Sequence, residues 1–165
     1  MKLVVVSDTH MPRMAKKLPS KLVEDLRTAD LIIHAGDWQT VDVARMFQEF
    51  APVVGVYGNT DDDDVREKFN KKEIIHIGEY TIGITHGHGT KKTMEERVLK
   101  MFAEDEVDCI IYGHSHIPVC KTVNGVLLFN PGSPTDKRRQ PSYSYGVLTI
   151  SDRFRAEHVF YNVKE

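Results

Sequence analysis

Five short polar motifs follow predicted strands and carry side chains that can bind metal ions. Each motif comes directly after an apolar run, and the five are Asp8-Thr9-His10, Gly36-Asp37, Gly58-Asn59, His86-Gly87-His88 and Gly113-His114-Ser115-His116. A lone Asp or His at a strand end is usually a cap or a surface residue. Recurrence at five strand ends instead indicates one site, because ligands of open α/β sheets bind outside the carboxyl ends of the strands.

The donor set points to a pair of divalent ions. It combines carboxylates, imidazoles and one amide oxygen without a thiolate, which suits Mn²⁺, Fe or Zn²⁺ better than Ca²⁺. The seven potential ligands are Asp8, His10, Asp37, Asn59, His86, His114 and His116. These exceed what one catalytic ion takes, so we expect two ions that share the Asp37 carboxylate. Alternate strand residues share a side, which lets Asp8 and His10 reach one ion, and a turn could direct His114 and His116 to different ions.

Other polar residues allow a structural and a functional interpretation. His34 lies inside an apolar strand and is expected to be a hydrogen-bonded core residue or a support for the site, whereas His76 and His158 are expected to be structural. Arg138 and Arg139 could bind phosphate oxygens with their guanidinium groups, or form a solvated basic patch. Asn130, in the run Asn130-Pro131-Gly132-Ser133, is expected to form a turn.

Composition is that of an ordinary globular protein. The 165 residues are 41% hydrophobic and 28% charged, with a formal net charge of −2, so we expect one domain spanning residues 1–165 and no stable binding to nucleic acid. Cys109 and Cys120 are expected to be free thiols. No apolar run is long enough for a membrane span or a signal peptide. We therefore expect a cytoplasmic protein, with self-association left open.

Hydrophobic periodicity predicts an α/β fold with enough strands for two packed sheets. In the first half, strands and helices alternate, which is typical of a parallel sheet with helical crossovers. The predicted strands are residues 2–6, 31–34, 53–57, 73–77, 80–85, 108–112, 119–123, 126–129, 144–150 and 156–163. The predicted helices are residues 18–28, 41–50, 61–69 and 93–103.

The motifs, in their order along the chain, resemble those of the calcineurin-like metallophosphoesterases. The Thr85-His86-Gly87-His88 run and the segment at residues 130–133 are similar to those of the small prokaryotic, YfcE-like phosphodiesterases. The resemblance implies a four-layer α-β-β-α sandwich with two mixed sheets. It also implies that Asp8, His10, Asp37 and His116 hold one ion. Asp37, Asn59, His86 and His114 would then hold the other.

The activity that the resemblance implies is hydrolysis of phosphodiester bonds in small substrates. We expect in-line attack of a metal-bridging hydroxide on phosphorus, with Mn²⁺ favoured and Fe, Ni or Zn²⁺ as alternatives. Asn59 is uncharged and would hold its ion without repelling an anionic substrate. The alternatives are a phosphomonoesterase or nucleotide pyrophosphatase on the same ions, and a non-catalytic scaffold of this fold such as one retromer subunit.

One position departs from the pattern of many relatives. They carry histidine directly after the Gly-Asn motif, often assigned as the acid for the leaving group, whereas this chain has Thr60. A hydroxyl cannot protonate an alkoxide as an imidazolium does. The hypothesis is that the protein prefers stabilised leaving groups, or that His88 or water serves as the acid.

The Thr60 hypothesis predicts a steep dependence of hydrolysis on the leaving group. With a series of phosphodiesters, kcat/KM should fall strongly as the pKa of the departing alcohol or phenol rises, because nothing protonates it efficiently. A flat dependence would contradict the hypothesis.

Overall fold

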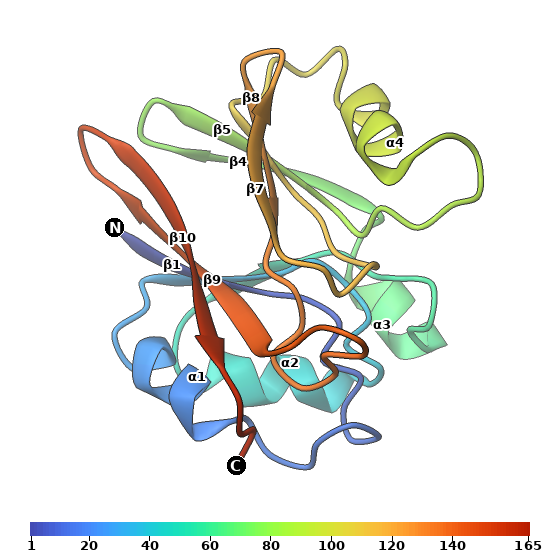
Figure 1. The fold of residues 1–165 in the computed structure, drawn as a ribbon, viewed down its shortest axis with the longest axis vertical. Coiled ribbons are helices and arrows are strands. Elements are labelled where there is room, and N and C mark those ends of the chain that lie inside the picture. The colour runs from blue at the N-terminus through green and yellow to red at the C-terminus, as the bar shows by residue number, and fades with distance from the viewer.

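Two five-stranded mixed sheets form the centre of the protein in a computed structural model that describes residues 1–165 (Figure 1). The first sheet has the order β10-β9-β1-β2-β3, and the second has the order β4-β5-β6-β8-β7. Strands of the first sheet are β1 (Lys2–Val6), β2 (Leu31–His34), β3 (Val53–Gly55), β9 (Tyr143–Ile150) and β10 (Phe154–Tyr161). Strands of the second are β4 (Lys72–Ile77), β5 (Tyr80–Thr85), β6 (Cys109–Ile111), β7 (Val119–Val123) and β8 (Val126–Asn130).

The parallel core of the first sheet explains the continuous apolar run of β1. β1 pairs in parallel with β2, which pairs in parallel with β3, while β9 and β10 add antiparallel strands on the other side. Alternate residues of β1 enter two different cores: Leu3 and Val5 face the second sheet, and Val4 and Val6 face the helices. A strand that is buried on both faces must be apolar throughout, as the sequence indicated.

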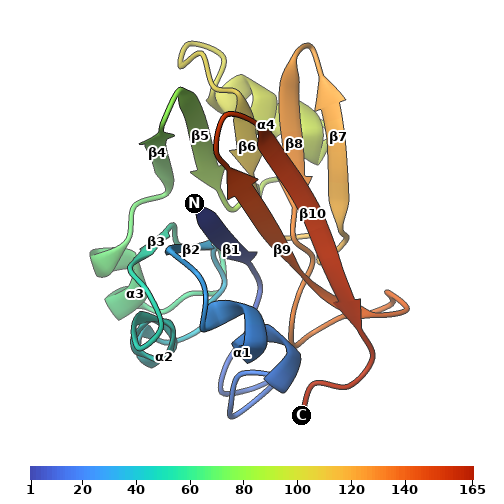
Figure 2. The ribbon, with the colours of Figure 1, turned by 90° about the vertical axis from the view of Figure 1, so that its left-hand side faces the viewer.

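Four helices cover the outer faces. They are α1 (Ser20–Leu26), α2 (Val41–Gln48), α3 (Asp63–Lys68) and α4 (Met94–Met101). Buried residues of α1 and α2 pack on the first sheet, and Val98 of α4 packs on the second, on the face away from the first sheet. Figure 2 shows α4 behind the second sheet and α1 and α2 beside the first. The four-layer α-β-β-α sandwich is therefore confirmed.

Every predicted helix and strand is present, with differences of a few residues at the ends. In the third strand the prediction ran over residues 53–57 but β3 ends at Gly55, and Val56 forms only an isolated bridge to Asn70. The chain turns early there because the following residues form the polar loop of the site. None of the helices has the length and hydropathy that crossing a bilayer requires. The cytoplasmic location stays a prediction.

The packing of α2 gives a test of the layer between helices and first sheet. Phe47 is fully buried and lies edge-on to His34, with 5.8 Å between ring centroids. Phe47→Ala should lower the free energy of unfolding by about 3–5 kcal/mol, because the cavity cannot collapse fully. Arg45→Ala on the same helix is the control and should change it by less than about 0.5 kcal/mol, since Arg45 is exposed. Equal effects in chemical denaturation would contradict this packing.

Candidate metal centre

Five of the predicted ligands sit in a backbone conformation that residues with side chains seldom adopt. Positive φ angles occur at Asp8 (57°), His10 (45°), Asp37 (59°), His114 (73°) and His116 (63°). Such strain clusters at functional sites, where the surrounding structure must hold it in place. It also corrects the strand-alternation argument for Asp8 and His10, because β1 ends at Val6 and left-handed turns direct both side chains instead.

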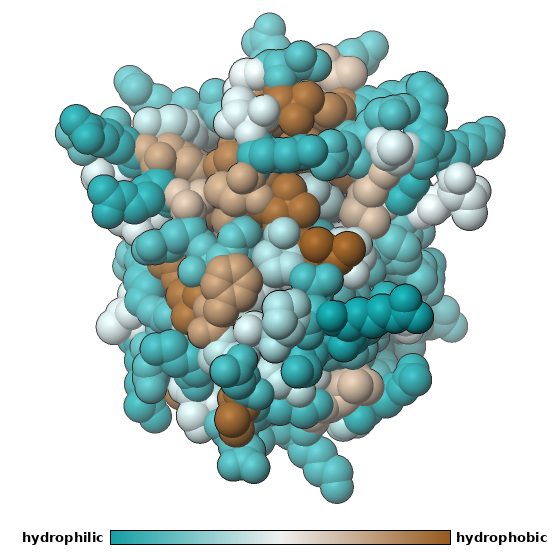
Figure 3. Space-filling model, in the orientation of Figure 1, coloured by the Kyte–Doolittle hydropathy of each residue, from teal (hydrophilic) through white to brown (hydrophobic).

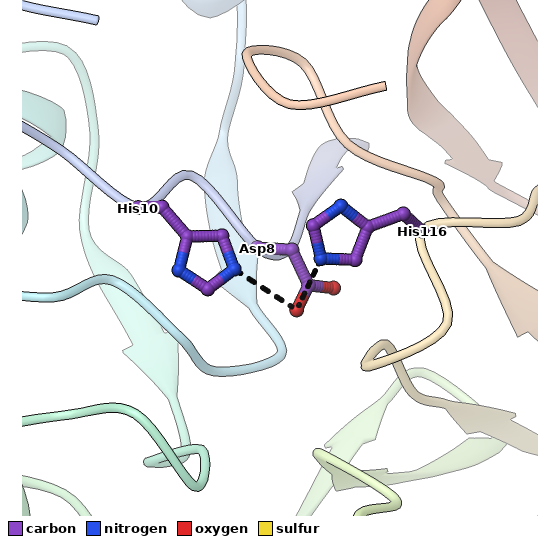
Figure 4. A group of neighbouring side chains, drawn as sticks. All are labelled: Asp8, His10 and His116. Carbon is purple, nitrogen blue, oxygen red and sulfur yellow. Dashed lines mark ion pairs between the residues drawn. The ribbon is translucent and has the colours of Figure 1, made fainter. Parts of the chain in front are cut away.

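Asp8, His10 and His116 form the first group of potential ligands. One oxygen of Asp8, Oδ1, lies 3.8 Å from Nε2 of His10 and 3.5 Å from Nε2 of His116. Figure 4 shows the two rings on either side of the Asp8 carboxylate, each directing a nitrogen at this oxygen. The rings stack with 5.3 Å between centroids, and all three residues are buried. One cation between these atoms would be bound by a carboxylate and two imidazoles.

Asp37, His86 and His114 form the second group. Their ligand atoms lie within 4.8 Å of one another, and Nε2 of His86 is 3.1 Å from Oδ2 of Asp37. His114 and His116 therefore belong to different groups although one residue separates them. The positive φ at both positions turns the two imidazoles apart.

The two groups are adjacent and Asp37 reaches both. Its Oδ2 lies 3.7 Å from Nε2 of His10, in the first group, while Oδ1 of Asp8 lies 3.7 Å from Nε2 of His86, in the second. Backbone hydrogen bonds hold the loops after β1 and β2 together, from Asp8 N to Gly36 O and from His10 N to Asp37 O. This geometry suits a carboxylate shared between two neighbouring cations.

Buried atoms without hydrogen-bond partners show that the residues fit a metal. They are Oδ1 of Asp8 and Nε2 of His10, His86 and His116, the atoms that converge in the two groups, together with Nδ1 of His88 and Oε1 of Gln39. Leaving a buried polar group unpaired is costly, so native structures rarely do so without a functional reason. Divalent cations would satisfy the converging atoms.

The remaining atoms of the ligands are fixed by hydrogen bonds to the protein. Nδ1 of His86 donates to Ala35 O at 2.8 Å, and Nδ1 of His116 donates to Asp136 O at 2.6 Å, which leaves each Nε2 lone pair free for a metal. Oδ2 of Asp8 accepts from Ser7 Oγ and from His114 N, so only Oδ1 is free. Ser7 and Asp136 were not identified from the sequence, because a backbone carbonyl and a preceding serine carry no distinctive motif.

Burial and the two carboxylates set the protonation of the site. Burial opposes charge on His86, but Asp8 and Asp37 outweigh it and raise the pKa of His86 to about 9. Burial lowers the pKa of His10 and of His114. Burial would raise the pKa of Asp37, but the His86 imidazole and the Thr60 N–H lower it further than burial raises it. A metal would therefore displace a proton from His86 on binding.

Asp61 braces the loops that carry Asp37 and Asn59. Its Oδ2 accepts from the backbone N–H groups of Asp37 at 2.9 Å and Gly58 at 2.7 Å, and its Oδ1 accepts from Gln39 N at 2.8 Å. Burial raises the pKa of Asp61 to about 6, against the effect of these donors. Its bracing role was not predicted, because one member of a run of four aspartates looks like a helix-start residue.

The segment at residues 130–136 supports the site from the opposite side. Ser133 Oγ donates to Asp8 O at 2.8 Å, and Thr135 Oγ1 donates to Thr9 O at 2.6 Å. Asn130 is fully buried, and its Nδ2 donates to Gly113 O while its Oδ1 accepts from Gly132 N. Asn130 thus forms the predicted turn and also holds the loop that carries His114.

At two positions the backbone passes so close to the ligands that only glycine fits. A side chain at Gly58 would collide with the Asp37 carboxylate, and one at Gly113 would collide with Ser7 Oγ and Asp8 Oδ2. Both positions therefore exclude any larger residue while the ligands keep this arrangement.

The other predicted site residues lie around the two groups. Asn59 is exposed between Gly58 and Thr60, and Thr60 N donates to Oδ1 of Asp37 at 3.0 Å, so the Asn59 loop adjoins the second group; its role as a ligand stays a prediction. His88 is half-buried, with its ring centroid 5.5 Å from that of His86. Burial, with the charges around it, lowers the pKa of His88 to about 4. Arg138 and Arg139 are exposed on the loop that follows Asp136.

Three further histidines lie outside both groups. His34 is buried, stacks on Trp38, and accepts from Gly36 N at 3.1 Å, so it supports the loop before Asp37. His76 is exposed, and His158 stacks on Phe129 and donates to Asn130 O. Neither of these two residues belongs to a group of ligands, in agreement with their predicted structural roles.

Comparison with known proteins gives consistent matches over nearly the whole chain. The family model for the calcineurin-like phosphoesterase superfamily domain matches residues 1–153. A probable metallophosphoesterase of Methanocaldococcus jannaschii is 34% identical over 154 residues, which cover 93% of this chain and 78% of that protein. A phosphodiesterase of the same organism is 32% identical over 147 residues, covering 80% and 83%.

Solved structures share the fold. A crystal structure of wild-type Vps29 from Entamoeba histolytica, in complex with Zn²⁺, superposes with a TM-score of 0.79 at 26% identity. The match covers 98% of this chain and all of that one.

The bracing role of Asp61 predicts a loss of metal affinity when its charge is removed. Asp61→Asn removes the negative charge that accepts from three N–H donors and replaces one acceptor oxygen with an NH₂ group. Divalent metal should then bind roughly 10- to 100-fold more weakly, as is typical when a residue that holds metal ligands in place is lost. Calorimetric titration with Mn²⁺ measures this. Asp64→Asn is the matched control, since Asp64 is exposed in the same acidic run. Equal affinity of both variants would contradict the role of Asp61.

Proposed function

The chain belongs to the calcineurin-like phosphoesterase superfamily, and on this basis we propose that it hydrolyses phosphodiester bonds in small substrates with two divalent ions. At the family level it is a metal-dependent phosphoesterase. The observation that carries the finer proposal is the pair of adjacent ligand groups whose converging atoms are buried and unpaired. Mn²⁺ is proposed as the metal because imidazole and carboxylate suit it, and Fe, Ni and Zn²⁺ remain alternatives.

The proposed division of ligands follows the two groups. Asp8, His10 and His116 would hold one ion, His86, His114 and Asn59 the other, and Asp37 both. When bound, such ions supply an activated water at neutral pH and offset charge on the phosphoryl oxygens. In the overall reaction water oxygen adds to phosphorus, one ester P–O bond breaks, and the departing alcohol takes a proton.

The protein's own contribution is to fix the ligands before substrate arrives. Backbone carbonyls hold the His86 and His116 rings in one orientation, and N–H and O–H donors hold one oxygen of each aspartate. Such preorganisation lowers the cost of reaching the reactive geometry. His88 lies beside the second group and is proposed to hydrogen-bond the substrate or a water there.

Two alternative functions are decided by turnover and not by metal binding. The Vps29 structure shows that a protein of this fold binds Zn²⁺. A scaffold function would therefore also be compatible with a filled site, and only hydrolysis distinguishes it. A phosphomonoesterase would hydrolyse the monoester in preference to the diester, which requires both substrates in the same assay.

The test is hydrolysis of bis(p-nitrophenyl) phosphate and of p-nitrophenyl phosphate after chelation and after addition of Mn²⁺. Activity on the diester should be lost on chelation, return with Mn²⁺, and exceed activity on the monoester. The Asp37→Ala variant should bind neither ion tightly. Its kcat/KM should fall by more than roughly 10- to 100-fold, the loss that is typical when only a residue supporting a metal ligand is removed. Arg45→Gln, exposed on α2, should behave as the unmodified protein.

Three outcomes would contradict the proposal in different ways. Preference for the monoester would indicate a phosphomonoesterase. Tight metal binding without hydrolysis of any ester would indicate a scaffold. Normal turnover of Asp37→Ala would exclude the shared carboxylate.

A further inference from the structure

Two surface recesses adjoin the loop that carries His114 and His116. Both are lined by Ser115, which lies between these two imidazoles, and by Ile117, which is 47% exposed. One recess has a volume of about 390 Å³ and is otherwise lined by Lys137, Arg138, Arg139 and Gln140. The other, of about 330 Å³, lies toward the start of α4. The two recesses differ sharply in chemistry.

The first recess is a concentration of positive charge with no acidic residue in its lining. Three of its six lining residues are cationic and none is acidic, in a chain whose formal net charge is −2. The guanidinium groups of Arg138 and Arg139 form no hydrogen bond or ion pair within the protein, and Lys137 contacts only the face of Tyr143, at 5.4 Å from the ring centroid. Unpaired guanidinium forks match phosphate oxygens in geometry.

A hydrogen bond ties this basic turn directly to the first ligand group. Asp136, the residue before Lys137, accepts from Nδ1 of His116 through its backbone carbonyl at 2.6 Å. The chain then makes a tight turn, closed from Gln140 N to Lys137 O at 2.9 Å, in which Arg138 has a φ of 49°. The turn that carries the three cationic residues is thus attached to the loop of His116.

The second recess has a different character. Met94, Tyr112, Ile117 and Val119 supply most of its lining, and Glu95, its one charged residue, pairs with Lys121 at 2.6 Å. Figure 3 shows a strongly hydrophobic spot close to a strongly hydrophilic side chain, between the lower end of β7 and the loop before β9. Any anionic group of a ligand would therefore be recognised on one side only.

We propose that the substrate is a phosphodiester with a second phosphate group on one of its two ester arms, bound by Lys137, Arg138 and Arg139. This inference rests on the proposed function. A diester carries one negative charge at the phosphorus that reacts, and two divalent ions already offset it. Three further cations without acidic partners fit an additional dianion. The apolar recess would take the other arm.

The proposal is tested with two substrates that differ only in this group. They are the p-nitrophenyl ester of thymidine 5′-phosphate and the same ester with a phosphate on the 3′ oxygen. With Mn²⁺ present, the 3′-phosphorylated ester should have the higher kcat/KM by roughly 10- to 100-fold, the range expected for charged hydrogen bonds. In the Arg138→Gln/Arg139→Gln variant the ratio of the two kcat/KM values should fall below about 3, since the charged hydrogen bonds to the 3′-phosphate are absent.

A matched control separates this effect from net charge. Arg153→Gln/Arg155→Gln also removes two positive charges, from exposed residues at the β9–β10 hairpin, and should keep the full ratio. Binding gives a readout that needs no turnover. Calorimetry should show that thymidine 3′,5′-bisphosphate binds more tightly than thymidine 5′-monophosphate, and that Arg138→Gln/Arg139→Gln removes the difference.

The results distinguish failure of this inference from failure of the proposed function. If both esters are hydrolysed at equal rates, the protein is a phosphodiesterase but the second phosphate is not recognised. If the arginine variant slows both esters equally and keeps their ratio, the arginines hold the reacting phosphate instead, and the inference is overturned. If no ester is hydrolysed under any metal condition, the proposed function is wrong and the inference falls with it.

Discussion

The buried carboxylates of Asp8 and Asp37 impose the constraint on which the rest of the site depends. Both direct an oxygen at the same imidazole, that of His86, at 3.7 and 3.1 Å. Two like charges away from water are stable only when positive charge lies between them. Without metal, a proton on His86 supplies part of that charge, and the raised pKa of this ring is the result. Divalent ions meet the same requirement more fully, which is why the free atoms of the site all face inward.

The fold meets this constraint by bringing the carboxyl ends of strands from both sheets to one place. The loops after β1 and β2 supply the aspartates, and the loops after β5 and β6 supply His86, His114 and His116. The ligand loops are then held in left-handed conformations by hydrogen bonds that they donate to Asp61 and by hydrogen bonds that they accept from Ser133 and Thr135. The strained backbone of the ligand residues persists because these hydrogen bonds hold it in place.

Sequence reasoning recovered the helices and strands because these depend on local patterns, whereas the expected grouping of the ligands came from the family resemblance. The apolar run of β1 and the polar residues that follow it can be seen directly in the sequence. The sequence alone could not explain why the side chains of Asp8 and His10 converge, because the left-handed turns at these residues depend on hydrogen bonds to residues far away in the chain. Asp61 illustrates the same limit. Its three N–H partners come from two separate loops, and nothing in the run of four aspartates distinguishes it from its neighbours.

The hydrogen bonds from residues 130–136 to the loop after β1 have a consequence for how the protein matures. All seven predicted ligands lie within the first 116 residues, yet Ser133 and the Asp136 carbonyl hold two of them, Asp8 and His116, and Thr135 holds Thr9 between Asp8 and His10. On the ribosome, a nascent chain that has exposed every ligand still lacks these supports. Tight capture of metal is therefore expected only after the segment before β9 has emerged.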